Sequence, residues 1–240
     1  MLLKDTAAGL EVFALRRVAG MAFAAGMTVF PGGAVDTADD AAPLAWVGPD
    51  TTWWAERLGV SARDAASLVV AAVRELFEET GVLLAGPALV LERQVTDADR
   101  LAILDRRLRL PAVLAAAGLP LRADLLRPWA NWITPPGHSR RYDTFFFAAA
   151  LPPGQRAEML TTEADLGQWR TPRALLAAGD VRGTALMPPT TAVLADLAGF
   201  DSVADVLAEH RVITPVRVWE SDLPDMPPGS PDVRREGKDR

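Results

Sequence analysis

The sequence predicts one α+β domain in which apolar strands and amphipathic helices alternate along the chain. The 240 residues are 50% hydrophobic, which is enough to bury a substantial core. Residues 12–15 and 145–147 are continuous apolar runs, which are typical of strands covered on both faces. Residues 62–80 instead carry apolar side chains at helical spacing. We therefore expect a single domain over residues 1–220, with an insertion, rather than two domains.

Two strands are predicted near the start of the chain. The first covers residues 9–15, and a second apolar run continues to Val29. Arg16 and Arg17 lie between them, in an order that superficially resembles a secretory signal. Because the apolar run leads into Pro31 and not into a small-residue cleavage site, we interpret both segments as core strands. Either arginine could reach a substrate phosphate, and a solvated strand end is an equally good alternative.

A helix is expected from about Ala62 to Thr80. Ser61 is a good N-cap, because its hydroxyl can accept a hydrogen bond from the first turn. Gly81 closes the helix, since glycine readily adopts the left-handed conformation of a C-cap. The apolar stripe predicts that one face of this helix lies against the core.

Three glutamates lie along one edge of this helix. Glu78 and Glu79 follow Glu75 by three and four residues, so the carboxylates converge and repel unless a cation lies among them. Arg74 can reach Glu78 at i,i+4, which leaves Glu75 and Glu79 aimed at a common point. Hard oxygen ligands at this spacing suit Mg²⁺ or Mn²⁺. On composition alone, a solvated acidic face is the favoured alternative.

A glycine turn upstream favours the metal interpretation. Residues 30–36 read Phe-Pro-Gly-Gly-Ala-Val-Asp, and Gly32 and Gly33 let the backbone approach a ligand closely. A Gly-Gly pair also marks ordinary turns, so it carries weight only in combination with the acidic helix.

Together, the turn and the helix resemble the Nudix box, which is written GX5EX7REUXEEXGU, with U a bulky aliphatic residue. The second half of the box is matched by Arg74, Glu75, Leu76, Glu78, Glu79, Gly81 and Val82. In the first half, Gly33 fits the glycine, and Asp39 occupies the glutamate position with Asp40 next to it. The box allows seven residues before the arginine, whereas positions 40 to 73, or 34 residues, intervene here. The pattern is most similar to long-insert Nudix proteins related to peroxisomal coenzyme A diphosphatases.

The resemblance implies an architecture and a reaction. The fold would be a Nudix α/β/α sandwich with a mixed β-sheet and an insertion, at about residues 40–60, inside the box. The reaction would be hydrolysis of the diphosphate linkage in a nucleoside diphosphate derivative, with Mg²⁺ or Mn²⁺ as cofactor. The implied metal ligands are Glu75, Glu79, Glu78 and the backbone of Gly32. Gly33 would give the loop room to approach the phosphate, and Arg74 would belong to the catalytic group.

The proton acceptor and the substrate are left open by the sequence. Either Glu78 or Glu163, which lies in a later loop, could take the proton of the attacking water. Nudix proteins that act on coenzyme A often carry an extra motif before FPGG, whose glycine falls at Gly26 and whose arginine is replaced by Ala22. Hydrolysis of coenzyme A or its acyl esters, hydrolysis of ADP-ribose, NADH or a nucleotide sugar, and ligand sensing without catalysis therefore all stay open.

Local cations would have to meet a phosphate group in this acidic protein. The formal net charge of −6 argues against a nucleic-acid or anionic-membrane surface and favours a small-molecule partner. Arg16 is one candidate contact. Arg140 and Arg141 are two others, because they precede the apolar strand at 145–147, although an exposed hairpin end explains them equally well.

The insertion carries Trp46, Trp53 and Trp54. These side chains either cap the core or line a pocket that stacks a nucleobase, and capping is the favoured interpretation.

Further elements follow from periodicity and turn residues. We expect strands over 82–91, 129–136 and 141–150, and helices over 97–108, 112–118, 190–197 and 202–209. The arginines at positions 100, 106, 107 and 109 are interpreted as a solvated face. Residues 221–240 are rich in proline, glycine and charge, so we expect a flexible tail.

The remaining expectations concern the cellular setting. The chain has no cysteine, which excludes thiolate metal sites and is compatible with a reducing cytoplasm, where we expect the protein to lie. No apolar run is long and unbroken enough to span a bilayer. A homodimer is left open.

Overall fold

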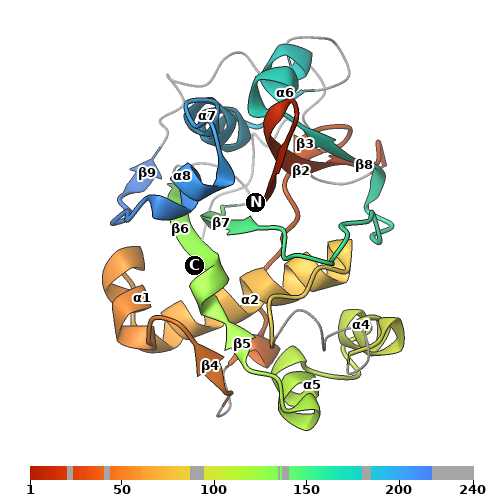
Figure 1. Cartoon of the computed structure of the whole chain (residues 1–240), viewed down its shortest axis with the longest axis vertical. Coiled ribbons are helices and arrows are strands. Elements are labelled where there is room, and N and C mark those ends of the chain that lie inside the picture. The colour runs from red at the N-terminus through yellow and green to blue at the C-terminus, as the bar shows by residue number, and fades with distance from the viewer. Residues whose placement is uncertain are drawn as a thin grey trace, which may run out of the picture.

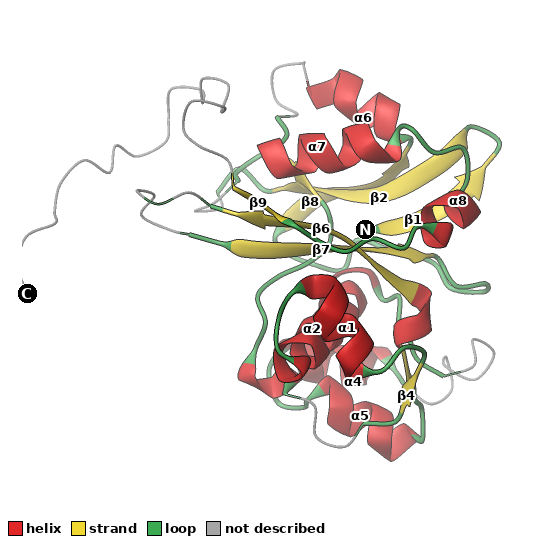
Figure 2. Cartoon of the chain, turned by 90° about the vertical axis from the view of Figure 1, so that its left-hand side faces the viewer, coloured by secondary structure: helices red, strands yellow, loops and turns green. Residues whose placement is uncertain are grey.

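The protein is an α/β/α sandwich, as seen in a computed structural model. The structure describes residues 1–20, 24–40, 44–86, 95–134, 136, 141–179 and 185–217. A mixed β-sheet forms the middle layer, with α6, α7 and α8 on one face and α1, α2, α4 and α5 on the other (Figure 2). The predicted α+β class and the sandwich are therefore confirmed.

Within the described residues, seven strands form the central sheet, in the order β3-β2-β1-β7-β6-β9, with β8 paired to β2. The pairs β1–β7 and β6–β9 are parallel, and the other pairs are antiparallel. The strands are β1 (Leu2–Thr6), β2 (Gly9–Arg17), β3 (Thr28–Val29), β6 (Leu126–Ile133), β7 (Asp143–Ala150), β8 (Ala164–Arg170) and β9 (Pro215–Arg217). The sequence did not indicate β1, although both leucines at its start are completely buried.

Helix α2 (Ala62–Thr80) has the predicted bounds and caps. The Ser61 side chain accepts a hydrogen bond from the backbone of Asp64, and Gly81 adopts a φ of 74°. Its buried apolar side chains belong to the core cluster that covers one face of the sheet. The helix runs across the lower half of the molecule in Figure 1, and its polar edge faces the loop that follows β3.

The insertion forms structure of its own. It contains β4 (Trp46–Val47), which pairs with β5 (Leu121–Arg122), and α1 (Thr51–Leu58), which packs on α2. Trp54 is completely buried and its ring centroid lies 6.0 Å from that of Phe147 on the sheet. This contact confirms core capping for Trp54 and excludes it from stacking on a ligand.

The region after α2 differs from prediction in three respects. Among residues 82–86, only Ala85 forms a β-bridge, to Leu121, so the predicted strand is absent there; residues 87–91 lie outside the described residues. The first predicted helix ends earlier, as α4 (Asp97–Leu104), and the second is α5 (Leu110–Ala117). Arg100 is buried and not solvated. Two short 3-10 helices, η1 (Thr37–Asp39) and η2 (Ala123–Leu125), complete this side.

The opposite face of the sheet is covered by α6 (Pro172–Gly179), α7 (Pro188–Leu197) and α8 (Val203–Ala208). The segment after α8 then passes to the other layer, where the N–H of Ile213 donates to the carbonyl of Arg57 at 2.8 Å. Its first arginine, Arg211, lies 3.6 Å from the centroid of the Trp129 ring. The predicted tail at 221–240 lies outside the described residues. Within the described part of the chain, no helix has the length and apolar character needed to cross a membrane.

Candidate active site

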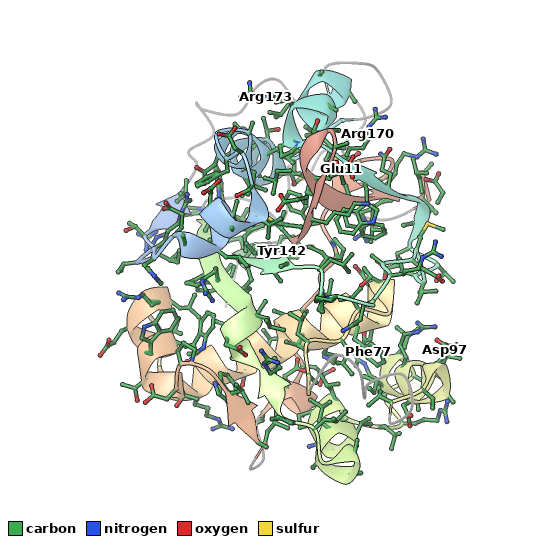
Figure 3. The ribbon with its side chains drawn as sticks, in the orientation of Figure 1. Glu11, Phe77, Asp97, Tyr142, Arg170 and Arg173 are labelled. Carbon is green, nitrogen blue, oxygen red and sulfur yellow. The ribbon has the colours of Figure 1, made fainter. Side chains whose placement is uncertain are left out.

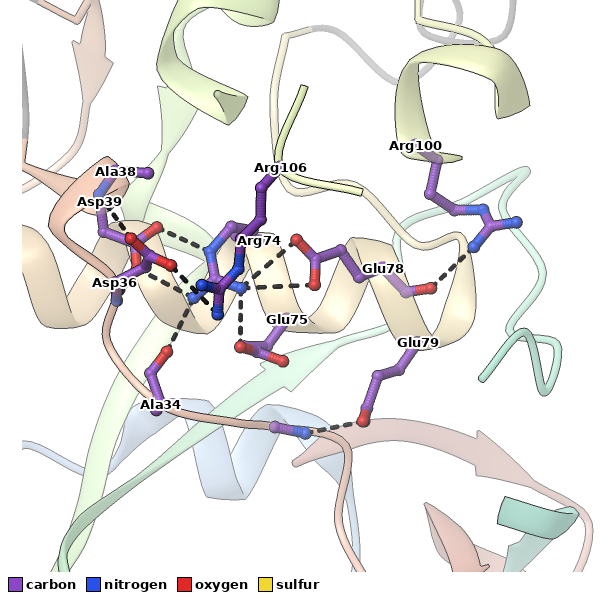
Figure 4. Close-up of polar contacts among 11 residues, drawn as sticks. Ala34, Asp36, Ala38, Asp39, Arg74, Glu75, Glu78, Glu79, Arg100 and Arg106 are labelled. Atoms are coloured by element: carbon purple, nitrogen blue, oxygen red, sulfur yellow. Dashed lines mark hydrogen bonds and ion pairs between the residues drawn. The ribbon is translucent and has the colours of Figure 1, made fainter. Parts of the chain in front are cut away.

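Arg74 is the polar centre of the candidate site (Figure 4). Its Nε and Nη2 donate to the two carboxylate oxygens of Asp39 at 2.7 and 2.9 Å. Its Nη1 donates to Glu75 at 2.7 Å and to Glu78 at 3.3 Å, and Nη2 also donates to the carbonyl of Ala34 at 2.8 Å. Charge-assisted bonds from a planar guanidinium fix both distance and direction. Arg74 therefore holds three carboxylates and the glycine loop in one arrangement.

Asp39 occupies the position where the Nudix pattern has a glutamate. Its side chain is completely buried, and besides Arg74 it accepts a 2.7 Å hydrogen bond from the N–H of Asp36. The second bond closes η1, which brings the shorter aspartate side chain up to the helix. Asp39 thus contacts Arg74 although 34 residues, instead of seven, lie between the two positions.

The glycine loop packs directly against two of the helix glutamates. The N–H of Gly32 donates to a carboxylate oxygen of Glu79 at 2.9 Å. A Cβ added at Gly33 would lie 2.5 to 2.6 Å from the carboxylate atoms of Glu75, far inside van der Waals contact. Figure 4 shows Glu75 and Glu79 turned toward this loop, whereas Glu78 points to the opposite side of the helix edge.

Burial makes the negative charge on these carboxylates costly. Desolvation raises the pKa of Glu75 and of Glu78, and in both cases Arg74 opposes the shift. Glu79 forms no ion pair with Arg74, and desolvation raises its pKa to about 8, against the opposing hydrogen bond from Gly32. One guanidinium therefore does not neutralise the cluster.

The carboxylates fit a hard divalent cation. Among the described residues, hydrogen bonds reach only one oxygen of Glu75 and one of Glu79. In that part of the chain, no group of three or more aspartates, glutamates or histidines is arranged to hold a metal by itself. Mg²⁺ commonly binds through one or two carboxylates and completes its shell with water and substrate phosphate. Glu75 and Glu79 offer that donor set.

Comparison with known proteins gives relatives of one kind. No family model matches the chain. Acyl-coenzyme A diphosphatase NUDT19 of Homo sapiens is 30% identical over 248 residues, which cover 83% of this chain and 64% of the relative. The protein of the same name in Gallus gallus is 29% identical over 240 residues, which cover 82% and 63% respectively. The chain thus spans just under two thirds of the length of these curated relatives.

A solved structure agrees with the sequence relatives. The crystal structure of a Nudix hydrolase from Alicyclobacillus acidocaldarius matches with a TM-score of 0.69 and 26% identity, over 88% of this chain and 94% of that one. This chain belongs to the Nudix superfamily. The box that the sequence indicated is thus placed in a Nudix fold, with α2 as its helix and residues 30–36 as its loop.

The close contact between Gly33 and Glu75 can be tested by substitution. We expect Gly33→Ala to lower metal-dependent turnover by on the order of a hundredfold, because the new methyl group must displace either the loop or the Glu75 carboxylate. Turnover and metal binding by calorimetry would be measured together. Gly20→Ala is the matched control, since a Cβ there meets nothing within 4 Å. Equal turnover in both variants would contradict a functional role for the close contact between Gly33 and Glu75.

The raised pKa of Glu79 predicts how stability depends on pH. Between the ordinary glutamate pKa of 4.5 and about 8, folded Glu79 keeps a proton that the unfolded chain has lost. The metal-free protein is therefore expected to become less stable as pH rises across this window. Thermal melts at pH 5, 6, 7 and 8 would show a falling Tm, and added Mg²⁺ should restore it at pH 8. A slope that Glu79→Gln leaves unchanged would contradict this assignment.

Two predicted residues, Glu163 and Arg16, lie on the β2–β8 side of the site. Glu163 is half exposed and forms a 2.8 Å ion pair with Arg17. It also contributes to the raised pKa of Glu79. Arg16 instead pairs with Asp165 at 2.7 Å, so this guanidinium is already engaged.

Of the two candidate phosphate contacts before β7, Arg140 and Arg141, the structure describes only Arg141. Arg141 is exposed, and its Nε donates to the carbonyl of Thr134 at 3.1 Å, which ties together the ends of β6 and β7. Arg140 lies outside the described residues. Arg140 and Arg141 therefore stay predictions as substrate contacts.

Arg100 is a structural part of the site that the sequence did not indicate. Its Nη1 donates to the backbone carbonyl of Glu78 at 2.9 Å, and its Nε donates to Asp97 at 2.7 Å. Asp97 lies at the outer surface at the start of α4, at the right of Figure 3. The arginines of this segment were interpreted as a solvated face, because helical spacing alone does not show that the guanidinium of Arg100 extends inward to α2.

Proposed function

We propose that the chain is a divalent-cation-dependent hydrolase that cleaves the diphosphate linkage of a nucleoside diphosphate derivative. The observation that carries the proposal is the placement of Glu75 and Glu79 against the Gly32–Gly33 loop, each with one oxygen that accepts no hydrogen bond from the described residues. Most acidic helix faces are exposed to water, whereas this one is largely buried and is organised by Arg74.

The metal ligands follow from this placement. Glu75 and Glu79 would hold Mg²⁺ or Mn²⁺, with Glu78 in support and the Gly32 backbone beside it. When bound, such a cation neutralises diphosphate charge and lowers the pKa of a coordinated water, which makes that water a nucleophile near neutral pH. Arg74 keeps the glutamates in position, and Gly33 keeps the loop close enough for a phosphate to be reached.

Glu78 and Glu163 are both retained as proton acceptors. Desolvation raises the pKa of Glu78, which makes its carboxylate a better base than an exposed one. Glu163 lies on the Glu79 side but is shared with Arg17 at 2.8 Å. Replacing each by glutamine and comparing the acidic limb of the pH–rate profile would separate the two, since only loss of the base removes that limb.

Coenzyme A and its acyl esters are the first candidate substrates. The supporting facts are the long insertion within the box and the similarity to two relatives described as acyl-coenzyme A diphosphatases. A second candidate class comprises ADP-ribose, NADH and nucleotide sugars, which is favoured by Ala22 in place of the arginine found in coenzyme A-directed proteins.

Chromatographic analysis of products tests the function directly. The purified chain would be incubated with coenzyme A, NADH and ADP-ribose in Mg²⁺, in Mn²⁺ and in excess chelator. Metal-dependent cleavage of coenzyme A at the diphosphate is the expected result, and preferential cleavage of another substrate would support the second candidate. Binding of these compounds without any cleavage would instead indicate a ligand-sensing Nudix domain.

A further inference from the structure

The linker between α4 and α5, residues 105–109, lies beside the carboxylate cluster. Arg106 extends from it toward Arg74, as Figure 4 shows, and its Nη2 is 3.5 Å from a carboxylate oxygen of Asp36. Arg106 is also close enough to Glu78 to oppose the rise in the pKa of that carboxyl. The linker therefore places a cation at the edge of the site, on the side opposite the Gly32–Gly33 loop.

The Arg106 guanidinium is largely uncommitted. Its side chain is 84% exposed, and its guanidinium N–H groups donate no hydrogen bond to the described residues. The neighbouring Asp36 is already engaged, because it caps η1 by accepting from the N–H of Ala38 at 3.0 Å. The 3.5 Å contact between the two side chains is thus longer than a hydrogen bond and leaves the guanidinium available to a ligand.

Other arginines around the site are engaged. Arg16 and Arg17 form ion pairs with acids of the β8 region at 2.7 and 2.8 Å, and Arg74 holds the central carboxylates. Even Arg107, the next residue of the linker, pairs with Asp105 at 3.1 Å. Arg106 therefore differs from these neighbours because its guanidinium donates no hydrogen bond to any residue that the structure describes.

The backbone holds this arginine in an uncommon conformation. Arg106 has a backbone φ of 59°, in a region that residues other than glycine rarely adopt. The turn is held by hydrogen bonds from its N–H to the carbonyl of Ile103 and from the N–H of Arg107 to that of Ala102, both at 2.8 Å. The preceding helix is joined to α2 through Arg100 and the carbonyl of Glu78. The fold thus fixes the position of the Arg106 backbone relative to the glutamates.

We propose that Arg106 binds a phosphomonoester on the substrate that is separate from the diphosphate to be cleaved. The inference rests on the proposed function for the nature of the substrate. The scissile diphosphate belongs with the cation on the Glu75 and Glu79 side, whereas Arg106 lies on the Glu78 side, where a flanking part of the substrate would extend. A guanidinium with free N–H groups matches the geometry of a terminal phosphate. The substrate class is therefore a nucleoside diphosphate derivative with a third, ribose-linked phosphate, as in coenzyme A and unlike ADP-ribose or NADH.

Calorimetric binding of two nucleotides tests the assignment without requiring turnover. Adenosine 3′,5′-bisphosphate and AMP differ only in the ribose phosphate, and both would be titrated into the full chain in Mg²⁺. We expect the bisphosphate to bind on the order of tenfold more tightly, as a charge-assisted hydrogen bond implies. Arg106→Ala should remove this difference by weakening the bisphosphate alone. Equal affinity of the unaltered protein for both nucleotides would overturn the proposal.

Two further variants control for charge and for folding. Arg107→Ala removes the same charge from the same linker but from an arginine paired with Asp105, so it should keep the tenfold preference. Arg106→Gly removes the guanidinium while relieving the positive φ, so it should lose the preference with an unchanged or higher Tm. If Arg107→Ala lost the preference to the same extent, the positive charge of the linker as a whole would explain the preference, and the proposal would be overturned.

The outcome is also separable from that of the proposed function. Cleavage of coenzyme A without a preference for the bisphosphate would support the proposed hydrolase function and contradict the role of Arg106. A preference for the bisphosphate that depends on Arg106, without cleavage of any diphosphate, would support the phosphate site and contradict the hydrolase function.

Discussion

Glu79→Gln is expected to reduce metal-dependent turnover by on the order of a thousandfold. Metal ions supply several kcal/mol of charge stabilisation in transition states, and each interval of about 1.4 kcal/mol corresponds to a tenfold change in rate. The substitution removes one ligand charge but little volume, and the amide can still accept the hydrogen bond from Gly32. The rate of product formation at saturating Mg²⁺ is the measurement.

Stability separates this effect from misfolding. Because burial raises the pKa of Glu79, a neutral side chain should leave the Tm unchanged or raise it at pH 8. Glu56→Gln is the matched control, since Glu56 is an exposed glutamate on α1 and should leave turnover unchanged. Full activity in Glu79→Gln would contradict the assignment of this residue as a metal ligand.

Arg74→Met is expected to destabilise the protein by about 3–5 kcal/mol, the usual cost of leaving buried charge without its partner. Asp39 is completely buried, and Glu75 and Glu78 would lose the same guanidinium. Methionine retains much of the length of the side chain, so the loss of charge dominates the loss of packing. The free energy of unfolding from urea denaturation is the measurement.

The same helix offers a matched control for this prediction. Arg63 pairs at 2.6 Å with Asp40, the residue that follows Asp39, but the Arg63 side chain is 76% exposed. Exposed pairs contribute about 0–1 kcal/mol, so Arg63→Met should cost far less than Arg74→Met. Comparable losses in the two variants would show that the burial of the Arg74 pair has no energetic importance.

Much of the fold could be predicted because local signals agreed with one another. Ser61, the apolar stripe and Gly81 fixed both ends of α2 without tertiary information. Strand β1 was missed because its residues alternate poorly and its pairing with β7 is distant in sequence. The predicted strand after Gly81 failed at residues 82–86 because an apolar run alone does not distinguish a strand from a buried extended segment.

The candidate site was predicted less completely than the fold. Spacing on one helix was enough to indicate that Glu75, Glu78 and Glu79 share an edge, but rotamers decide that Glu78 turns away from the glycine loop. The partnership of Asp39 with Arg74 crosses the insertion and depends on the closure of η1. Arg106 was assigned to a solvated surface, because sequence cannot show which exposed arginine faces a site.

The order of strands in the sheet determines how the protein must fold. Strand β1 lies between β2, its neighbour in sequence, and β7, with Leu2 opposite Ala149. Closing so long a stretch of chain costs entropy before any contact compensates for it. Folding is therefore expected to be slow, on a timescale of about milliseconds to seconds. During synthesis, the second edge of β1 stays unpaired until β7 has been made, so the glutamate helix acquires its finished support only late in the life of the nascent polypeptide.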